Sequence, residues 1–149
     1  MFNIIALRRH QAFVRQSHCC FYCECPMWER RPDIFLSKYA IPAELGKLVQ
    51  CTAEHLKARC EGGPNTAENI VAACWHCNQK RHQSSRPLSP HDFSGYVRAR
   101  MSKGRWQPPE LRKLLVRPEG SIHHGQGPKA MAVRIACGLR LAEHLRSES

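Results

Sequence analysis

The sequence predicts an α+β fold in which a small β-hairpin and the helix that follows it lie between further helices. Two Cys-x-x-Cys pairs, at residues 20–23 and 74–77, frame the middle of the chain. Between them, two short strand-like runs flank a turn rich in Gly, Pro and Asn. On both sides of this region, apolar residues recur at helical spacing. A chain of 149 residues accommodates one modest domain with extensions, and no second domain with its own core.

The first segment predicts an amphipathic helix, which we place within residues 1–18. Its apolar positions fall at helical spacing, with Arg and Gln between them: Ile4, Leu7, Ala12 and Phe13. Residues 27–46 contain two prolines and no dominant period beyond a possible short helix. We interpret them as an insertion.

The central segment, residues 19–88, predicts the hairpin and helix of the core. Residues 48–56 suit a strand, residues 61–65 are dense in turn residues, and residues 69–73 suit a second strand. A helix over residues 75–83 follows, and the proline shortly after it prevents its continuation.

The last third of the chain predicts a basic helical extension over residues 89–118. Ser89 can cap a helix of about 12 residues that ends at Gly104, and a shorter helix follows over residues 108–116. Residues 119–149 begin with a Gly-rich stretch and predict a linker and a tail helix.

The cysteine count favours metal binding over disulfides. Nine cysteines leave one unpaired, and Arg8 and Arg9 directly follow a very short apolar start that does not resemble a secretory signal. No apolar run approaches the roughly 20 residues of a membrane span. We therefore expect a cytoplasmic protein with reduced thiols and no membrane partner.

Only two registers give the Cys-x-x-Cys spacing, and together they predict one closed structural Zn²⁺ site with the ligands Cys20, Cys23, Cys74 and Cys77. The alternative is two unrelated turns with buried thiols, and the neighbours His18, Cys19 and Cys25 blur the choice of ligands. Three further cysteines have no partner spacing and are expected to be buried or free: Cys51, Cys60 and Cys137.

Several motifs lie in order between and after the pairs: Glu54-His55, Gly62-Gly63, Asn69, and Cys74-Trp75-His76-Cys77-Asn78. In this respect the middle half of the chain resembles the HNH endonuclease family, in the subtype with zinc hooks and Asn at the third motif position. The resemblance implies a ββα-metal core, stapled by the Cys₄ zinc, that hydrolyses DNA phosphodiester bonds with one divalent metal ion. An open alternative is a non-catalytic, zinc-stabilised module that binds nucleic acid.

The resemblance also implies residue roles. His55 matches the general base, Asn69 the residue that ties the hairpin and orients this base, and Asn78 the third catalytic position. Glu54 and Asn78 match the ligands of the catalytic metal, although Asp is commoner than Glu at the first of these positions. Imidazole can accept a proton near neutral pH. Neighbouring strand residues point to opposite faces, so Glu54 and His55 need local twist to serve one site.

The ligands Glu54 and Asn78 offer only oxygen, which favours Mg²⁺ or Mn²⁺. A formal charge of +11 favours a polyanionic partner, so we expect DNA to be bound, with RNA left open. For Trp106, a packing role is favoured over stacking on a base. The residues expected to contact nucleic acid are Lys57, Arg59, Lys80, Arg81 and His82.

Overall fold

The computed structural model describes residues 3–115 of the chain and confirms the α+β fold. Its helices are α1 (Ile4–Arg15), α2 (Pro32–Tyr39), α3 (Trp75–His82), α4 (Pro90–Ser102) and α5 (Pro109–Leu115). Its strands are β1 (Cys51–His55) and β2 (Ile70–Cys74), and two 3₁₀ helices are η1 (Ala43–Val49) and η2 (Arg59–Glu61). The linker and tail helix expected within residues 119–149 lie outside the described residues.

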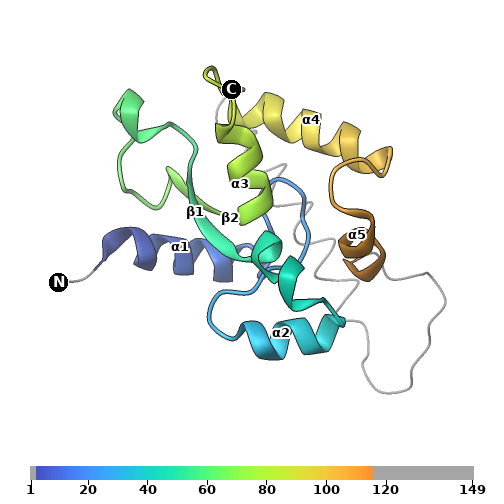
Figure 1. Ribbon diagram of the computed structural model, residues 1–149. Coiled ribbons are helices and arrows are strands. Elements are labelled where there is room, and N and C mark those ends of the chain that lie inside the picture. The colour runs from blue at the N-terminus through green and yellow to red at the C-terminus, as the bar shows by residue number, and fades with distance from the viewer. Residues whose placement is uncertain (1–2, 116–149) are drawn as a thin grey trace.

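The hairpin is the centre of the fold. Strands β1 and β2 are antiparallel, and their register pairs Cys51 with Cys74 and His55 with Ile70. Helices α1 and α3 both pack on the hairpin, as Figure 1 shows. Every residue of β2 is buried, whereas β1 is partly open, so β2 is the inner strand.

Helix α1 begins at the N-cap Asn3, whose side chain accepts from the backbone of Ala6, and it buries Ala12 and Phe13 against the hairpin. It ends before residue 18 because Ser17 and His18 adopt positive φ angles of 54° and 64°. This turn directs the chain into the first cysteine pair.

The side chain of Gln16 pairs with the backbone of β2 along the edge that faces away from β1, where a further strand would otherwise pair. Its amide accepts from the backbone nitrogen of Ala72 at 2.9 Å and donates to the carbonyl of the same residue at 2.8 Å. An edge strand has unpaired backbone groups, and this contact satisfies one pair of them.

The insertion, residues 27–46, contains α2, and η1 follows as far as the start of β1. The first strand therefore begins at Cys51 and not at residue 48. A second apolar cluster lies here, with Ile41, Val49 and Leu111 buried at its centre. The insertion is joined to α1 by Glu29, whose carboxylate contacts Arg9 and His10.

Helix α4 of the predicted extension is packed into the main core. Phe93 makes edge-to-face contacts with Tyr22 at 4.9 Å and with Trp106 at 5.8 Å, and Val97 is fully buried. Trp106 is 7 % exposed, in agreement with the packing role favoured by the sequence. Among residues 3–115, no helix combines the length and apolar character needed to cross a membrane.

Candidate metal centres and active site

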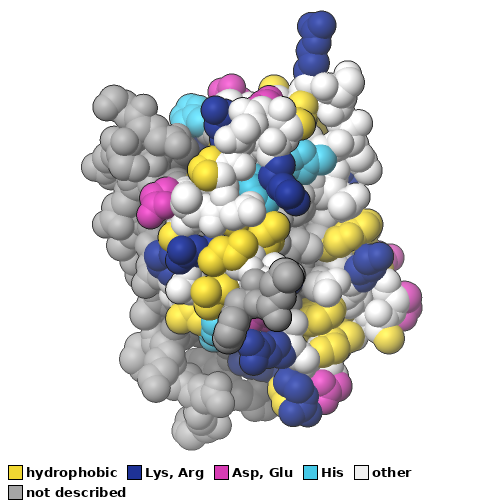
Figure 2. All heavy atoms as spheres, turned by 90° about the vertical axis from the view of Figure 1, so that its left-hand side faces the viewer, with side chains coloured by type: hydrophobic (Ala, Val, Ile, Leu, Met, Phe, Trp, Pro, Cys, Tyr) yellow, Lys and Arg dark blue, Asp and Glu magenta, His cyan; other side chains and the backbone are white. Residues whose placement is uncertain are grey.

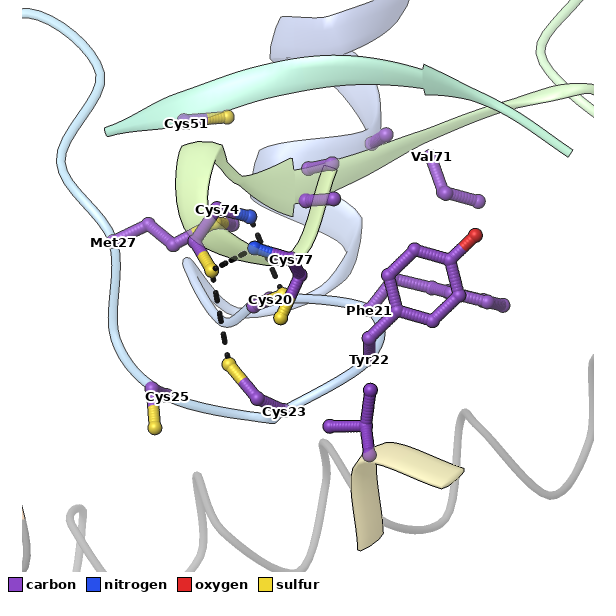
Figure 3. Close-up of a cluster of buried hydrophobic side chains, with 14 of the residues drawn as sticks. Cys20, Phe21, Tyr22, Cys23, Cys25, Met27, Cys51, Val71, Cys74 and Cys77 are labelled. Atoms are coloured by element: carbon purple, nitrogen blue, oxygen red, sulfur yellow. Dashed lines mark hydrogen bonds between the residues drawn. The ribbon is translucent and has the colours of Figure 1, made fainter. Parts of the chain in front are cut away.

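Four buried cysteines from distant parts of the chain converge beside the hairpin. The sulfurs of Cys20, Cys23, Cys74 and Cys77 all lie within 4.8 Å of one another (Figure 3). The sulfurs of Cys23 and Cys74 are 3.8 Å apart. Tetrahedral bonds of about 2.3 Å to Zn²⁺ imply a sulfur–sulfur separation of about 3.8 Å. The cluster could therefore hold a metal ion with little movement.

Local backbone geometry forms both cysteine hooks. In the first, Glu24 has a φ of 58°, and the chain folds back so that Cys20 donates its N–H to the carbonyl of Cys25. In the second, Cys74 is the N-cap of α3 and accepts from the N–H of Cys77 at 3.4 Å.

Further N–H groups point at the sulfurs. Cys74 donates its N–H to Cys20 at 3.3 Å, and the indole of Trp106 donates to Cys77 at 3.3 Å. Donors of this kind stabilise negative charge on sulfur.

The four thiols differ in acidity. Burial raises the pKa of Cys20, but hydrogen bonds from the other three thiols outweigh it and lower this pKa well below its usual value. The hydrogen bond to Cys20 raises the pKa of Cys23 and of Cys74, and burial raises that of Cys77. Of the four thiols, Cys20 alone has its pKa lowered. A bound dication would deprotonate the other three thiols.

The neighbouring cysteines lie outside this cluster. The sulfur of Cys25 accepts from Gln107 at 3.0 Å, and Cys51 occupies a separate place near the start of β1 (Figure 3). Burial raises the pKa of Cys51 to about 12. Cys60 is exposed and forms no disulfide. Cys137 lies outside the described part of the chain.

The turn between the strands is fixed by Gly63 and Asn69. A Cβ atom on Gly63 would lie 1.9 Å from the carbonyl oxygen of Lys57, so only glycine fits there. Asn69 accepts from the backbone N–H of Lys57 at 2.8 Å and donates to the carbonyls of Lys57 and Pro64 at 3.1 and 2.9 Å. Asn69 therefore ties the hairpin loop.

His55 stands at the end of β1, and its imidazole contacts a different asparagine from the one expected. Its Nε2 lies 2.9 Å from Oδ1 of Asn65. The side chain of Asn69 is bonded to Lys57 and Pro64, and its carbonyl accepts from Leu56 at 2.9 Å. Asn69 thus makes no direct hydrogen bond to the imidazole among the described residues.

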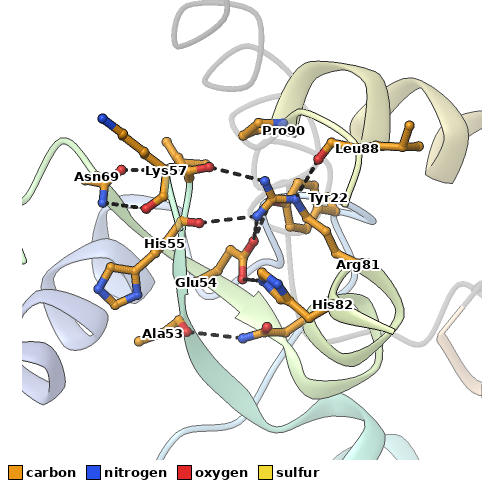
Figure 4. Close-up of polar contacts among 12 residues, drawn as sticks. Tyr22, Ala53, Glu54, His55, Lys57, Asn69, Arg81, His82, Leu88 and Pro90 are labelled. Atoms are coloured by element: carbon orange, nitrogen blue, oxygen red, sulfur yellow. Dashed lines mark hydrogen bonds and ion pairs between the residues drawn. The ribbon is translucent and has the colours of Figure 1, made fainter. Parts of the chain in front are cut away.

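Glu54 leaves β1 in another direction from His55, and Figure 4 shows its carboxylate facing α3. It is 1 % exposed and has three partners. Its Oε1 accepts from the hydroxyl of Tyr22 at 2.9 Å and from the guanidinium of Arg81, while Oε2 lies 3.0 Å from Nε2 of His82.

Asn78 lies one helical turn before His82 on α3, so the two side chains share a face of the helix. Its Nδ2 donates to the hydroxyl of Thr52 at 2.9 Å and to the carbonyl of Ala53 at 3.1 Å, which aims the amide at β1. Its Oδ1 makes no hydrogen bond within residues 3–115. The interface of β1 and α3 thus contains oxygen and nitrogen atoms that could bind a metal ion, from Glu54, Asn78 and His82.

These elements coincide with a known family. The family model for the HNH endonuclease matches residues 42–84, which include β1, the glycine loop, β2 and α3. The chain contains an HNH domain. Members of this family are in general nucleases that act on nucleic acids with divalent metals. No curated protein and no solved structure gives a significant match.

The basic residues expected to contact nucleic acid divide into two groups. Lys57, Arg59 and Lys80 of the HNH domain are exposed, and the side chain of His82 is 37 % exposed. On the face shown in Figure 2, Lys and Arg are spread among His and apolar side chains and do not form one patch. Arg81 is different because it is 5 % exposed and its guanidinium is used inside the domain. Its burial contradicts the expectation that Arg81 contacts nucleic acid.

Three side-chain contacts of the candidate site were not predicted from the sequence: Asn65 with His55, Tyr22 with Glu54, and His82 with Glu54. The first was hidden because Asn in a Gly-Gly-Pro turn is expected to serve the turn. The third had a usable signal, since His82 follows Asn78 by four residues on a helix. The second had no signal, because Tyr22 reaches Glu54 only through the folding of the first hook.

Proposed function

We propose that this chain is a metal-dependent endonuclease that hydrolyses DNA phosphodiester bonds with His55 as general base. The observation that carries the proposal is the contact of 3.0 Å between Glu54 of β1 and His82 of α3, with Asn78 one helical turn before His82 and His55 next to Glu54 in the same strand. This arrangement lies within the HNH match.

The catalytic metal would be held by Glu54 and Asn78, and we add His82 as a third ligand. Oε2 of Glu54 and Nε2 of His82 are 3.0 Å apart. Adjacent ligands of an octahedral ion with bonds of about 2.1 Å are separated by about 3.0 Å. The imidazole makes the ligand set mixed, which favours Mn²⁺ over Mg²⁺. When bound, such an ion supplies positive charge at the phosphate and at the departing oxygen.

The protein's own residues account for the remaining steps. His55 takes a proton from water, and the resulting hydroxide forms a bond to phosphorus while one P–O ester bond breaks. The departing oxygen keeps the electron pair and receives a proton from solvent. Exposed Lys57, Arg59 and Lys80 would contact the DNA backbone. Binding governed by such contacts weakens steeply as salt rises.

The cysteine cluster would hold Zn²⁺ in a structural role. Four sulfur ligands close the coordination shell, so no position is left for water or substrate. The hooks join the segment before the insertion to the start of α3, and zinc would fix the hairpin between them.

One observation favours a second candidate function, a non-catalytic module that binds nucleic acid. The carboxylate of Glu54 is buried and paired with the guanidinium of Arg81. A cation already at this carboxylate opposes the binding of a metal ion there.

Cleavage of supercoiled plasmid decides between the two. We expect nicking with Mn²⁺, and more weakly with Mg²⁺, that is lost in His55→Ala and retained in His91→Ala, which alters an exposed histidine on α4. Fluorescence anisotropy with labelled DNA should show unchanged binding by His55→Ala. Binding without cleavage by the wild type, across both metals and with both DNA and RNA, would establish the binding module instead.

A further inference from the structure

The ring of His55 is held by a side chain in the loop between the strands. Its Nε2 lies 2.9 Å from Oδ1 of Asn65, and both residues are half-buried. An amide oxygen only accepts hydrogen bonds, so this contact requires the proton of a neutral imidazole to reside on Nε2. The lone pair is then on Nδ1.

The position of Asn65 is itself fixed. The carbonyl of Pro64, which belongs to the peptide bond preceding Asn65, accepts from Nδ2 of Asn69 at 2.9 Å. Asn69 is anchored in turn on both backbone groups of Lys57. Figure 4 shows the two bonds between Asn69 and Lys57 at the end of β1. Asn69 can thus influence His55 through Pro64 and Asn65.

The glycines before this segment restrict the loop further. Gly62 has a φ of 81°, and Gly63 leaves no space for a Cβ atom against the carbonyl of Lys57. Because the backbone before Asn65 is held at Gly63 and Pro64, its side chain is supported as a hydrogen-bond partner for His55.

We propose that Asn65 is a positioning residue that fixes the tautomer and ring orientation of His55, so that Nδ1 is the atom that accepts the proton. This inference rests on the proposed nuclease function. In the reaction, a water O–H bond breaks, its proton moves to Nδ1, and the oxygen bonds to phosphorus as the ester bond breaks. The imidazolium that forms keeps its Nε2 proton on Asn65. Asn65 exchanges no proton.

A purely structural role for Asn65 makes a different prediction. Asn is common in turns, and a turn residue can be replaced with a loss of stability alone. Two measurements, one of which needs no activity, separate this role from positioning.

The first measurement is ¹⁵N NMR of the His55 ring in the zinc-loaded protein above neutral pH. We expect the Nε2–H tautomer in the wild type and a mixture of both tautomers in Asn65→Ala. Thr66→Ala, which alters an exposed neighbour in the same loop, should leave the wild-type pattern. An Nδ1–H tautomer in the wild type, or an unchanged tautomer in Asn65→Ala, would overturn the proposal.

The second measurement is the rate of plasmid nicking. Asn65→Ala should lower kcat by about 10- to 100-fold with little change in KM, since small misplacements of a reacting group cost about this much. Thr66→Ala should keep the wild-type kcat. A wild-type kcat in Asn65→Ala would leave Asn65 as a turn residue only.

The two proposals fail separately. If the wild type does not nick any substrate, the nuclease function fails, while the NMR result still decides whether Asn65 fixes the ring of His55. If the wild type nicks and the tautomer is insensitive to Asn65, only the positioning role fails.

Discussion

The substitution Arg81→Met removes the only guanidinium that reaches the buried carboxylate of Glu54 within the described residues. Arg81 is 5 % exposed and Glu54 is 1 % exposed. Besides this ion pair, Arg81 donates to the carbonyls of His55, Leu56 and Leu88, each at 3.2 Å. Methionine can fill much of the same volume but satisfies none of these acceptors.

The expected loss in free energy of unfolding is about 3–5 kcal/mol, which is the usual cost of leaving one charge of a buried pair without its partner. Whole domains are stabilised by only about 5–15 kcal/mol, so this loss is large. With a urea slope of about 1–1.5 kcal/mol/M for a small domain, the midpoint should fall by about 2–5 M. Changing the carboxylate to an amide in Glu54→Gln/Arg81→Met removes the unpaired charge. This double variant should be more stable than Arg81→Met alone.

Urea unfolding followed by far-UV circular dichroism, with zinc in excess in every sample, measures both effects. Lys80→Met is the matched control because its side chain is exposed on the same helix, and its effect should stay within about 0.5 kcal/mol. A loss below about 1 kcal/mol in Arg81→Met would refute the reasoning. So would a double variant no more stable than the single one.

Three further outcomes follow from the described contacts. Cys77→Ser should lose its bound zinc and its cooperative unfolding, whereas Cys60→Ser, at an exposed thiol, should retain both, as measured by metal analysis and calorimetry. Gly63→Ala should lower the free energy of unfolding by at least about 1–3 kcal/mol, because its Cβ would clash with the backbone of Lys57. Gly95→Ala in α4 has open space around its Cβ and should raise the free energy of unfolding by about 0.5–1 kcal/mol. Equal urea midpoints for the two variants would contradict this. Burial raises the pKa of Glu29, but hydrogen bonds from His10 and Arg9 outweigh burial and lower this pKa. The stability that the Glu29 carboxylate contributes is therefore present above the unfolded pKa of about 4.3. This stability is lost as pH falls through the lower folded value. Glu29→Gln should therefore lose about 1–2 kcal/mol at pH 7 and differ less from the wild type at pH 3; a constant difference would show that the charge is not responsible.

The features that could be predicted from the sequence are those set by local pattern. The β-hairpin and α3 were predicted because strand runs, glycine turns and proline stops act over a few residues. The cysteine cluster was predicted because the spacing of each hook already places two sulfurs together. The first strand was predicted to begin three residues too early, since the apolar residues at the end of η1 also suit a strand.

The contacts of the candidate site depend on distant parts of the chain and could not be read from spacing. Arg81 belongs to a run of basic residues, which usually indicates a solvated face. It is buried because Glu54, 27 residues earlier, points at the same side of α3. The alternation of strand residues correctly indicated that Glu54 and His55 point in different directions. Only the fold shows that Glu54 contacts residues of α3 and that His55 contacts Asn65 in the loop.

The link between the cysteine cluster and the proposed catalytic site follows from Tyr22, which lies between Cys20 and Cys23 in the first hook. Its hydroxyl donates to Glu54 at 2.9 Å, and the side chain is fully buried. Burial, followed by the charge of Glu54, raises the pKa of Tyr22 well above its usual value, so the hydroxyl stays a neutral donor at physiological pH. A metal that fixes the hook therefore also fixes one of the hydrogen bonds that orient the carboxylate. A closed zinc shell at these cysteines would have no chemistry of its own, yet it would support the site proposed for a second metal.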